Sequence, residues 1–408
     1  MAPVLRRFAT LTGLVLLTGA SAALAADAKP ILIGVNTPIQ LQLGRDSVDA
    51  IQMGVDEINA KGGVLGRKLK VVVADEGTNP QQGVAAVEKL TEEEHVDVLI
   101  GGANSGVTLA EEPHIAEAKT IWIINGSSSN ANTAFVKKDY KRYKYVFRVN
   151  PINSRHLAEQ LVGFTTGMLK NELGYRKMAL VGENAVAMQE IARAVKAGME
   201  KGGIEVTMME LFDPDTSDFS PLFSKVKASG AQYLVIMLSH ANSDVFVKQW
   251  HDAKFPLPIG GFDIKSQNPN FCSRIGGKSI GETLSNNLTS APITPKTVAF
   301  WNAFTGRYHR APVYTGPGGY DALHVYVEAV ERAKSTDPEK VIPELEKTKY
   351  VGTEGTIEFD ESHDVKTGPG NLNLLFQQWQ ANCTRAVVWP KEVATGKMIL
   401  PPWIAAKH

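Results

Sequence analysis

The chain has 408 residues, of which 43% are hydrophobic and 21% are charged. This length and composition predict a soluble globular protein of more than one domain and argue against a disordered chain. The 43 basic residues balance the 43 acidic ones and form no long basic stretch, so no nucleic-acid partner is expected.

The N-terminus has the pattern of a secretory signal. Arg6 and Arg7 precede the apolar run 8–17, and small residues follow up to an Ala-x-Ala site that ends at Ala25. A basic region, a short apolar core and such a site are typical of a cleaved signal peptide, and the run is too short for a membrane anchor. We therefore expect residues 1–25 to be removed and the mature protein to be exported. The cleavage site has no cysteine, so no lipid attachment is expected.

From residue 31 onward, strand and helix patterns alternate. Short apolar runs predict strands at 31–35, 69–74, 96–100 and 121–124, and helical spacing of apolar residues separates them. A second run of the same kind begins near Asn150, with strands at 178–181, 204–209, 233–238 and 257–260. Helices at 298–308 and 320–333 and a β-rich tail follow. The pattern predicts an α/β fold with two parallel-core sheets in two lobes joined by a hinge.

Three loops are the candidate ligand-binding segments. In open parallel sheets, ligands bind beyond the carboxyl ends of the strands, which here are the loops 36–44, 101–106 and 125–130. The last two are small, polar and rich in donors, so they could hold an anion through backbone N–H groups and serine hydroxyls. From composition alone, the plainer interpretation is that Ser105 caps a helix and that Ser127, Ser128 and Ser129 form an ordinary loop.

Enzyme motifs are missing from the sequence. It contains no G-x-S-x-G elbow, no phosphate-binding loop with a Lys-Ser/Thr ending and no H-E-x-x-H or paired C-x-x-C. The stretch 361–364 places His363 beside carboxylates and is predicted to be a solvated turn. We expect no catalytic residue, metal or cofactor. Cys272 and Cys383 form either a disulfide, which an oxidising compartment permits, or two buried thiols.

Longer motifs carry a resemblance to a known family. The segments are 56–69, followed by Asp75 and Asn79-Pro80, then 147–148, 216–220, 319–322 and 355–360. They resemble the leucine/isoleucine/valine-binding family of periplasmic proteins, which serve ATP-driven importers of amino acids and amides. The resemblance covers residues 31–390, nearly the whole mature chain. It implies two Rossmann-like lobes that close on a ligand. The first lobe would comprise residues 27–149 and 285–359, and the second would comprise residues 150–284 and 360–408.

The resemblance also implies a ligand site. The family's carboxylate-binding positions match Ser105, Ser127 and Ser128, which reverses the plainer interpretation of those loops, with Asn104 and Ser129 as neighbours. The family's aromatic residue in the first loop matches Leu43, its Tyr-Gly pair falls at Ala187-Met188, and its tyrosine in the second lobe falls near Ser239 or His240. The acidic partner of a ligand ammonium has Phe262 as its nearest match and Asp263 one residue later. Asp263 then either faces the cleft or lies in a surface turn.

The resemblance implies a periplasmic, monomeric binding protein that delivers a carboxylate-bearing solute to the membrane permease of an ABC importer. Branched-chain amino acids are the default ligands. If Asp263 does not face the cleft, the ligand could be an amide or an organic acid, including an aromatic one. A ligand-sensing role on the same fold is the remaining alternative.

Overall fold

The computed structural model describes residues 29–239, 242–287, 290–368 and 370–404, so the predicted signal segment and His240 lie outside the described residues. The N-terminal part forms a five-stranded parallel sheet in the order β2-β1-β3-β4-β5. The strands are β1 (Ile31–Thr37), β2 (Leu69–Asp75), β3 (Val98–Gly101), β4 (Ile121–Ile124) and β5 (Val146–Arg148). Strands β3, β4 and β5 are buried along their whole length, as expected for a parallel sheet covered on both faces.

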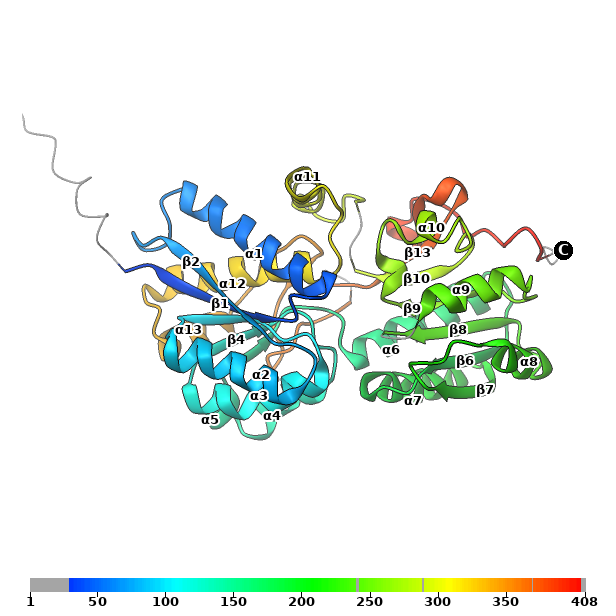
Figure 1. Ribbon diagram of the computed structural model, residues 1–408, viewed down its shortest axis with the longest axis horizontal. Coiled ribbons are helices and arrows are strands. Elements are labelled where there is room, and N and C mark those ends of the chain that lie inside the picture. Colours follow the sequence, from blue (N-terminus) through cyan, green and yellow to red (C-terminus); the bar gives the residue numbers. More distant parts are fainter. Residues whose placement is uncertain (1–28, 240–241, 288–289, 369, 405–408) are drawn as a thin grey trace, which may run out of the picture.

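Helices from two distant parts of the chain cover this sheet. The helices that follow its strands are α1 (Gln42–Ala60), α2 (Pro80–Glu88), α3 (Ser105–Ala118), α4 (Ala131–Lys138) and α5 (Tyr140–Tyr143). From much later in the chain come α11 (Thr297–Tyr308), α12 (Thr315–Ala333) and α13 (Pro338–Leu345). Helix α12 lies beside α1 on one side of the sheet, and α2 and α3 lie on the other (Figure 1). We call this part the first lobe.

The second lobe contains a seven-stranded sheet in the order β14-β13-β10-β9-β8-β6-β7. Its strands are β6 (Lys177–Glu183), β7 (Glu205–Phe212), β8 (Tyr233–Leu238), β9 (Ile259–Asp263), β10 (Thr283–Asn286), β13 (Leu375–Trp379) and β14 (Arg385–Trp389). Strands β6 to β10 are parallel to one another. Strand β13 pairs antiparallel with β10, and β14 pairs antiparallel with β13. Its helices are α6 (Ser154–Phe164), α7 (Val186–Lys201), α8 (Ser220–Ala228), α9 (Ser243–Asp252) and α10 (Phe271–Arg274). A short pair, β11 (Tyr350–Val351) and β12 (Thr356–Ile357), lies in the first lobe.

Each sheet has its own apolar core, which confirms the predicted α/β architecture of two lobes. The first core includes Val149, and the second lobe's cores begin at Ile152, so the chain crosses between the lobes at residues 149–152. The chain crosses for the last time from the first lobe to the second between residues 372 and 374, later than the expected boundary at Phe359. Val365 and Leu372 still pack in the core of the first lobe, and Leu374 packs in a core of the second lobe. Figure 1 shows the two lobes side by side.

A disulfide joins Cys272, at the start of α10, to Cys383, just before β14. Their Cα atoms lie 5.4 Å apart although 111 residues separate them in the sequence. The bond therefore ties the two antiparallel strands added to the second sheet to its α10 side. Among the described residues, no helix is long and apolar enough to span a bilayer.

Candidate functional site

A cavity of about 620 Å³ lies between the two lobes and is lined by both. The first lobe contributes the loops after β1, β2, β3 and β4 and the residues just before α12. The second lobe contributes residues that follow β5, β6, β8 and β9. The lining residues are Pro38, Leu41, Gln42, Leu43, Gly77, Thr78, Ala103, Asn104, Ser105, Gly106, Gly126, Ser128, Ile152, Ala185, Met188, Ser239, Phe262, Ile264, Lys265, Asn268, Arg274, Val313 and Tyr314. This is the crevice that the topology predicts, because the strand order β2-β1-β3-β4-β5 reverses between the parallel strands β1 and β3.

The loop between β3 and α3 places Ser105 at the cavity and leaves its hydroxyl unused as a helix cap. Gly102 has a φ of +76°, and a Cβ there would lie 2.6 Å from Cζ2 of Trp122, so glycine is required for the turn. Asn104, not Ser105, caps α3: its Oδ1 accepts the N–H groups of Gly106 (3.0 Å) and Val107 (3.3 Å). Ser105 is the first helical residue, and its hydroxyl is not used as a cap.

Ser105 Oγ lies inside the loop formed by Ser127, Ser128 and Ser129. It accepts the backbone N–H groups of Ser128 (3.3 Å) and Ser129 (3.1 Å), and Ser127 Oγ is 3.1 Å away. With its lone pairs used by the backbone, the Ser105 hydroxyl can offer a ligand only its proton. The Ser128 hydroxyl has no hydrogen-bond partner among the described residues, and Ser128 also lines the cavity. Two hydroxyl donors side by side suit a carboxylate.

The other two serines of this loop have structural partners. Ser127 Oγ donates to Asn132 Oδ1 at 2.6 Å, and Ser129 Oγ donates to Glu190 Oε1 at 3.3 Å. Both side chains are buried, and neither lines the cavity. The prediction that all three serines face the ligand is therefore wrong for Ser127 and Ser129, because their hydroxyls hold the loop itself in place.

Backbone donors of the glycine-rich turn are also used within the protein. The carboxyl group of Glu76 accepts the N–H groups of Ala103 (3.1 Å) and Asn104 (3.2 Å). Glu76 is fully buried, and burial together with the neighbouring Glu111 carboxylate raises its pKa well above the usual value. The expectation that these N–H groups bind an anion is wrong, because a buried side chain of the protein already occupies them.

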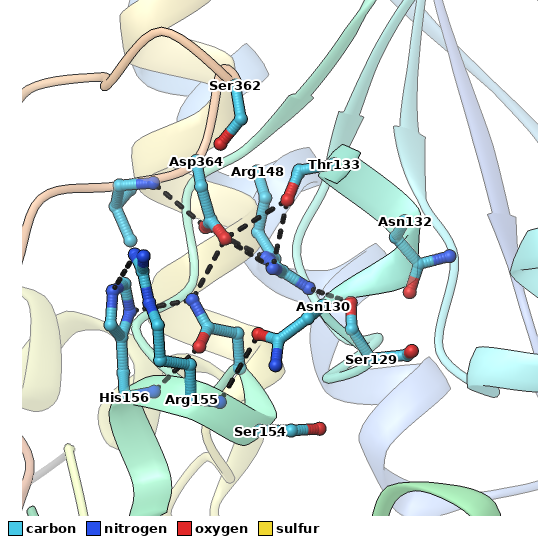
Figure 2. Close-up of polar contacts among 12 residues, drawn as sticks. Ser129, Asn130, Asn132, Thr133, Arg148, Ser154, Arg155, His156, Ser362 and Asp364 are labelled. Atoms are coloured by element: carbon cyan, nitrogen blue, oxygen red, sulfur yellow. Dashed lines mark hydrogen bonds and ion pairs between the residues drawn. The ribbon is translucent and has the colours of Figure 1, made fainter. Parts of the chain in front are cut away.

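Arg148 holds the loop formed by Ser127, Ser128 and Ser129, the serine loop, through hydrogen bonds to its backbone. Its guanidinium is fully buried, and Nη1 donates to the carbonyl oxygens of Ser129 (2.8 Å) and Ser127 (3.3 Å), while Nε donates to Asp364 Oδ1 (2.9 Å). Figure 2 shows Arg148 between Asp364 and Ser129, with the Thr133 hydroxyl near both ends of the ion pair. Burial alone would raise the pKa of Asp364, but attraction to Arg148 and the hydrogen bond from Arg148 hold it below the usual value.

The segment 361–364 forms the predicted turn with Glu361 exposed, but its last two residues are not solvated. His363 is 2% exposed and stacks on Phe147, with ring centroids 3.9 Å apart, and Asp364 is 3% exposed in its ion pair. His363 Nδ1 lies 3.1 Å from the carbonyl oxygen of Val146, and burial lowers its pKa. Arg148 and Val146, which bind Asp364 and His363, lie more than 200 residues earlier in the chain, so local sequence could not reveal these contacts.

Asp263 neither faces the cavity nor lies in a surface turn. It is 1% exposed, and its Oδ1 accepts the Ser266 N–H at 3.1 Å. Burial raises its pKa to about 6. Phe262 in β9 and Ile264, just after the end of the strand, line the cavity on either side of it. Phe262 and Asp263 point to opposite faces because successive side chains of a strand alternate.

Of the remaining predicted ligand residues, some line the cavity and others lie outside the described part of the structure. Leu43 and Asn104 line the cavity, although the side-chain oxygen of Asn104 is used in capping α3. Ala187 lies in α7, but its side chain is outside the described part of the structure, as is His240; their neighbours Met188 and Ser239 line the cavity. Sequence reasoning missed Ile152, Lys265, Val313 and Tyr314, which come from segments without a recognisable motif.

Contacts across the cavity hold the lobes together. Asn268 Nδ2 of the second lobe donates to Gln42 Oε1 of the first at 2.5 Å. At the hinge, the N–H and hydroxyl of Ser154, the first residue of α6, both donate to the Ser128 carbonyl oxygen, at 2.6 and 3.0 Å. The serine loop thus lies where the first lobe meets the second. Within the described residues, no three His, Cys, Asp or Glu side chains are grouped as a metal site would require.

A cavity shared by two α/β lobes, with polar loops from one and an apolar wall from the other, is typical of a hinged ligand-binding protein. The chain belongs to the periplasmic binding protein family, whose model matches residues 30–384. It is 26% identical over 386 residues to the leucine-, isoleucine-, valine-, threonine- and alanine-binding protein of Pseudomonas aeruginosa, covering 90% of this chain and 94% of that one.

Two solved structures have the same fold. One is a protein from Silicibacter pomeroyi described as a putative branched-chain amino acid ABC transporter, with a TM-score of 0.82, 22% identity and coverage of 92% of this chain and 100% of that one. The other is a solute-binding protein of an R. palustris ABC transporter in complex with benzoate, with a TM-score of 0.72, 17% identity and coverage of 92% and 99%.

Proposed function

We propose that this protein is the periplasmic substrate-binding component of an ABC importer and captures a small carboxylate with an apolar body. The observation that carries the proposal is the pair of hydroxyls of Ser105 and Ser128 beside a mainly apolar cavity between two lobes. Ligand pockets of about 300–1,000 Å³ with a few placed polar groups are the usual size and kind for small molecules.

Relatives support this role. The Pseudomonas aeruginosa relative is named for the amino acids it binds, and the R. palustris structure contains benzoate. Both kinds of ligand carry a carboxylate. The predicted signal at residues 1–25 supports export to the periplasm, and the lobe-closing contact between Gln42 and Asn268 supports capture by hinge closure. We propose that the protein is a monomer. Its first lobe comprises residues 29–149 and 287–372, and its second lobe comprises residues 150–286 and 373–404. The closed form docks on a membrane permease.

Calorimetric titration tests the carboxylate site. The protein is refolded from denaturant to remove copurified ligand and is titrated with 4-methylpentanoate, 3-phenylpropanoate and the primary amide of each. We expect the acids to bind and the amides to bind much more weakly, because an amide lacks the charge that the hydroxyl donors favour. Ser105→Ala should weaken binding of the acids by about 1–3 kcal/mol.

The matched control is Ser224→Ala, an exposed serine on α8 far from the cavity in the sequence and in the fold. It should leave affinity unchanged. Equal binding of acids and amides, or full affinity in Ser105→Ala, would show that the carboxylate is held elsewhere or that the ligand is neutral.

A further inference from the structure

The ionisable side chains that line the cavity are basic. Among the described lining residues, Lys265 and Arg274 are the charged ones, and no aspartate or glutamate is present. The positions between 29 and 404 that lie outside the described residues are His240, Ala241, Leu288, Thr289 and Pro369, none of which has a carboxylate. Asp244 pairs with Arg274 through both guanidinium nitrogens, whereas Lys265 makes no ion pair within the described part of the chain. Lys265 therefore places a positive charge without an ion-pair partner beside the cavity, and its side chain is exposed.

The nearby buried carboxyl groups are used inside the protein. Glu76 accepts two backbone N–H groups of the loop after β3, and Asp263 accepts the Ser266 N–H. Glu183 is fully buried and accepts the hydroxyl of Ser239, which itself lines the cavity. Each of these carboxyl groups accepts a donor of its own lobe, although Asp263 Oδ2 has no partner among the described residues.

Three further carboxyl groups lie close to the lining residues. Asp46 accepts the Val313 N–H and pairs with Arg310, and Asp75 accepts the Gly77 N–H. Glu190 lies two residues after Met188 on α7. Its Oε1 accepts the Ser129 hydroxyl at 3.3 Å, which joins the second lobe to the serine loop of the first. Its Oε2 has no partner among the described residues, but Glu190 is not part of the cavity lining. Glu190 is thus a rival partner for a ligand cation, as is Asp263, whose Oδ2 also has no partner among the described residues.

We propose that the ligand is a carboxylic acid without an ammonium group, held in a cavity whose charge selects against amino acids. This inference rests on the proposed function, since it concerns the same carboxylate at Ser105 and Ser128. In an α-amino acid, the ammonium is on the carbon next to the carboxylate, so these two serines would draw it into the cavity. An ammonium there meets the apolar walls formed by Leu43, Ile152, Met188, Phe262, Ile264 and Val313 and finds no carboxylate among the described lining residues to pair with.

Four ligands with the same carbon skeleton separate the two questions. They are 4-methylpentanoate, 4-methylpentanamide, L-leucine and L-leucinamide, which differ only in the carboxylate and the ammonium. Calorimetry on the refolded protein gives the dissociation constant of each. We expect 4-methylpentanoate to bind at least about 100-fold more tightly than L-leucine, since an unpaired buried charge is strongly unfavourable. The same order is expected for 3-phenylpropanoate over L-phenylalanine.

The outcomes are distinguishable. Binding of L-leucine as tight as that of 4-methylpentanoate, with both amides weak, overturns this inference but leaves the carboxylate site intact. Amides that bind as well as the acids overturn the proposed carboxylate site itself. If no member of either series binds, both the proposed function for small apolar acids and this inference are wrong.

Two variants test the charge directly. Lys265→Gln should weaken binding of 4-methylpentanoate by about two- to fivefold at low salt and less at high salt, because the ammonium is solvent-exposed. Lys227→Gln, at an exposed lysine on α8, is the matched control and should have no effect. Glu190→Gln should not change the preference for the acid over the amino acid. Selective loss of L-leucine binding in Glu190→Gln would identify Glu190 as an ammonium partner and overturn the proposal.

Discussion

Arg148 and Asp364 form a buried ion pair that connects the hinge to the serine loop. The two residues lie 216 positions apart, one at the end of β5 and the other on the segment that leads to the last crossing. Asn153, which caps α6 in the second lobe, donates to the same Asp364 carboxylate at 2.9 Å (Figure 2 shows the surrounding cluster). Because Arg148 also holds the Ser127 and Ser129 carbonyl oxygens, one charged pair fixes the ligand loop, the hinge and the start of the second lobe.

The first prediction concerns this pair. Asp364→Asn should lower the free energy of unfolding by about 3 kcal/mol or more, because it leaves the Arg148 guanidinium buried without its counter-ion. Urea unfolding followed by far-UV circular dichroism measures the change. Glu361→Gln is the control: Glu361 also makes an ion pair, with Lys137, but both side chains are exposed, so little change is expected. Similar losses in both variants would mean that the buried pair has no special role.

The second prediction concerns pH. Burial raises the pKa of Glu112 to about 8, and its partners are Asn132, whose amide donates to it at 2.9 Å, and the neighbouring charges of Arg148 and Glu111. A carboxyl group with a raised folded pKa stabilises the fold at low pH, and this contribution is lost as pH rises from its unfolded pKa toward 8. The slope from this one group is at most about 1.4 kcal/mol per pH unit.

Glu112→Gln should therefore flatten the fall of the melting temperature between pH 5 and pH 8, and the variant should gain stability relative to the wild type at pH 8. Differential scanning calorimetry across this range measures both effects. Glu117→Gln changes an exposed glutamate of the same helix and should leave the pH profile as in the wild type. Parallel profiles for wild type and Glu112→Gln would mean that Glu112 is ionised at neutral pH.

The third prediction concerns lobe closure. Gln42→Ala removes the hydrogen bond to Asn268 across the cavity, which should speed ligand dissociation by up to about tenfold, as expected for one hydrogen bond of 0.5–1.5 kcal/mol. Stopped-flow measurements give the dissociation rate, and small-angle scattering should show a more open average shape without ligand. Gln52→Ala, on the same helix α1 and bonded to Asp56 one turn later, is the control. Unchanged dissociation in Gln42→Ala would show that this contact does not hold the closed form.

The fourth prediction concerns the disulfide. Replacing both Cys272 and Cys383 by alanine opens a loop of 111 residues and should lower the free energy of unfolding by about 2–5 kcal/mol. Ligand affinity should remain, because neither cysteine lines the cavity. Thermal unfolding and calorimetric titration of the same variant measure the two properties. Lost affinity with unchanged stability would indicate that the bond shapes the site rather than stabilising the fold.

Local signals explain what the sequence could predict. Buried strands followed by donor-rich loops placed the loops of Ser105 and Ser128 at the carboxyl edge of the first sheet, since a strand, a turn and a helix start are all set by neighbouring residues. Both serines line the cavity, but the resemblance, not the composition of the loops, predicted them as ligand residues. The direction in which Asp263 points depends on strand alternation at the end of β9, and the two interpretations left open were both wrong. Lys265, Tyr314 and the pair of Arg148 with Asp364 depend on contacts between distant segments, which one sequence does not reveal.

A crystal structure of the protein grown with 4-methylpentanoate tests the proposed carboxylate site most directly. The carboxylate should lie within hydrogen-bond distance of Ser105 Oγ and Ser128 Oγ, with the hydrocarbon chain against Met188 and Phe262. A carboxylate bound away from both serines would contradict the proposed site.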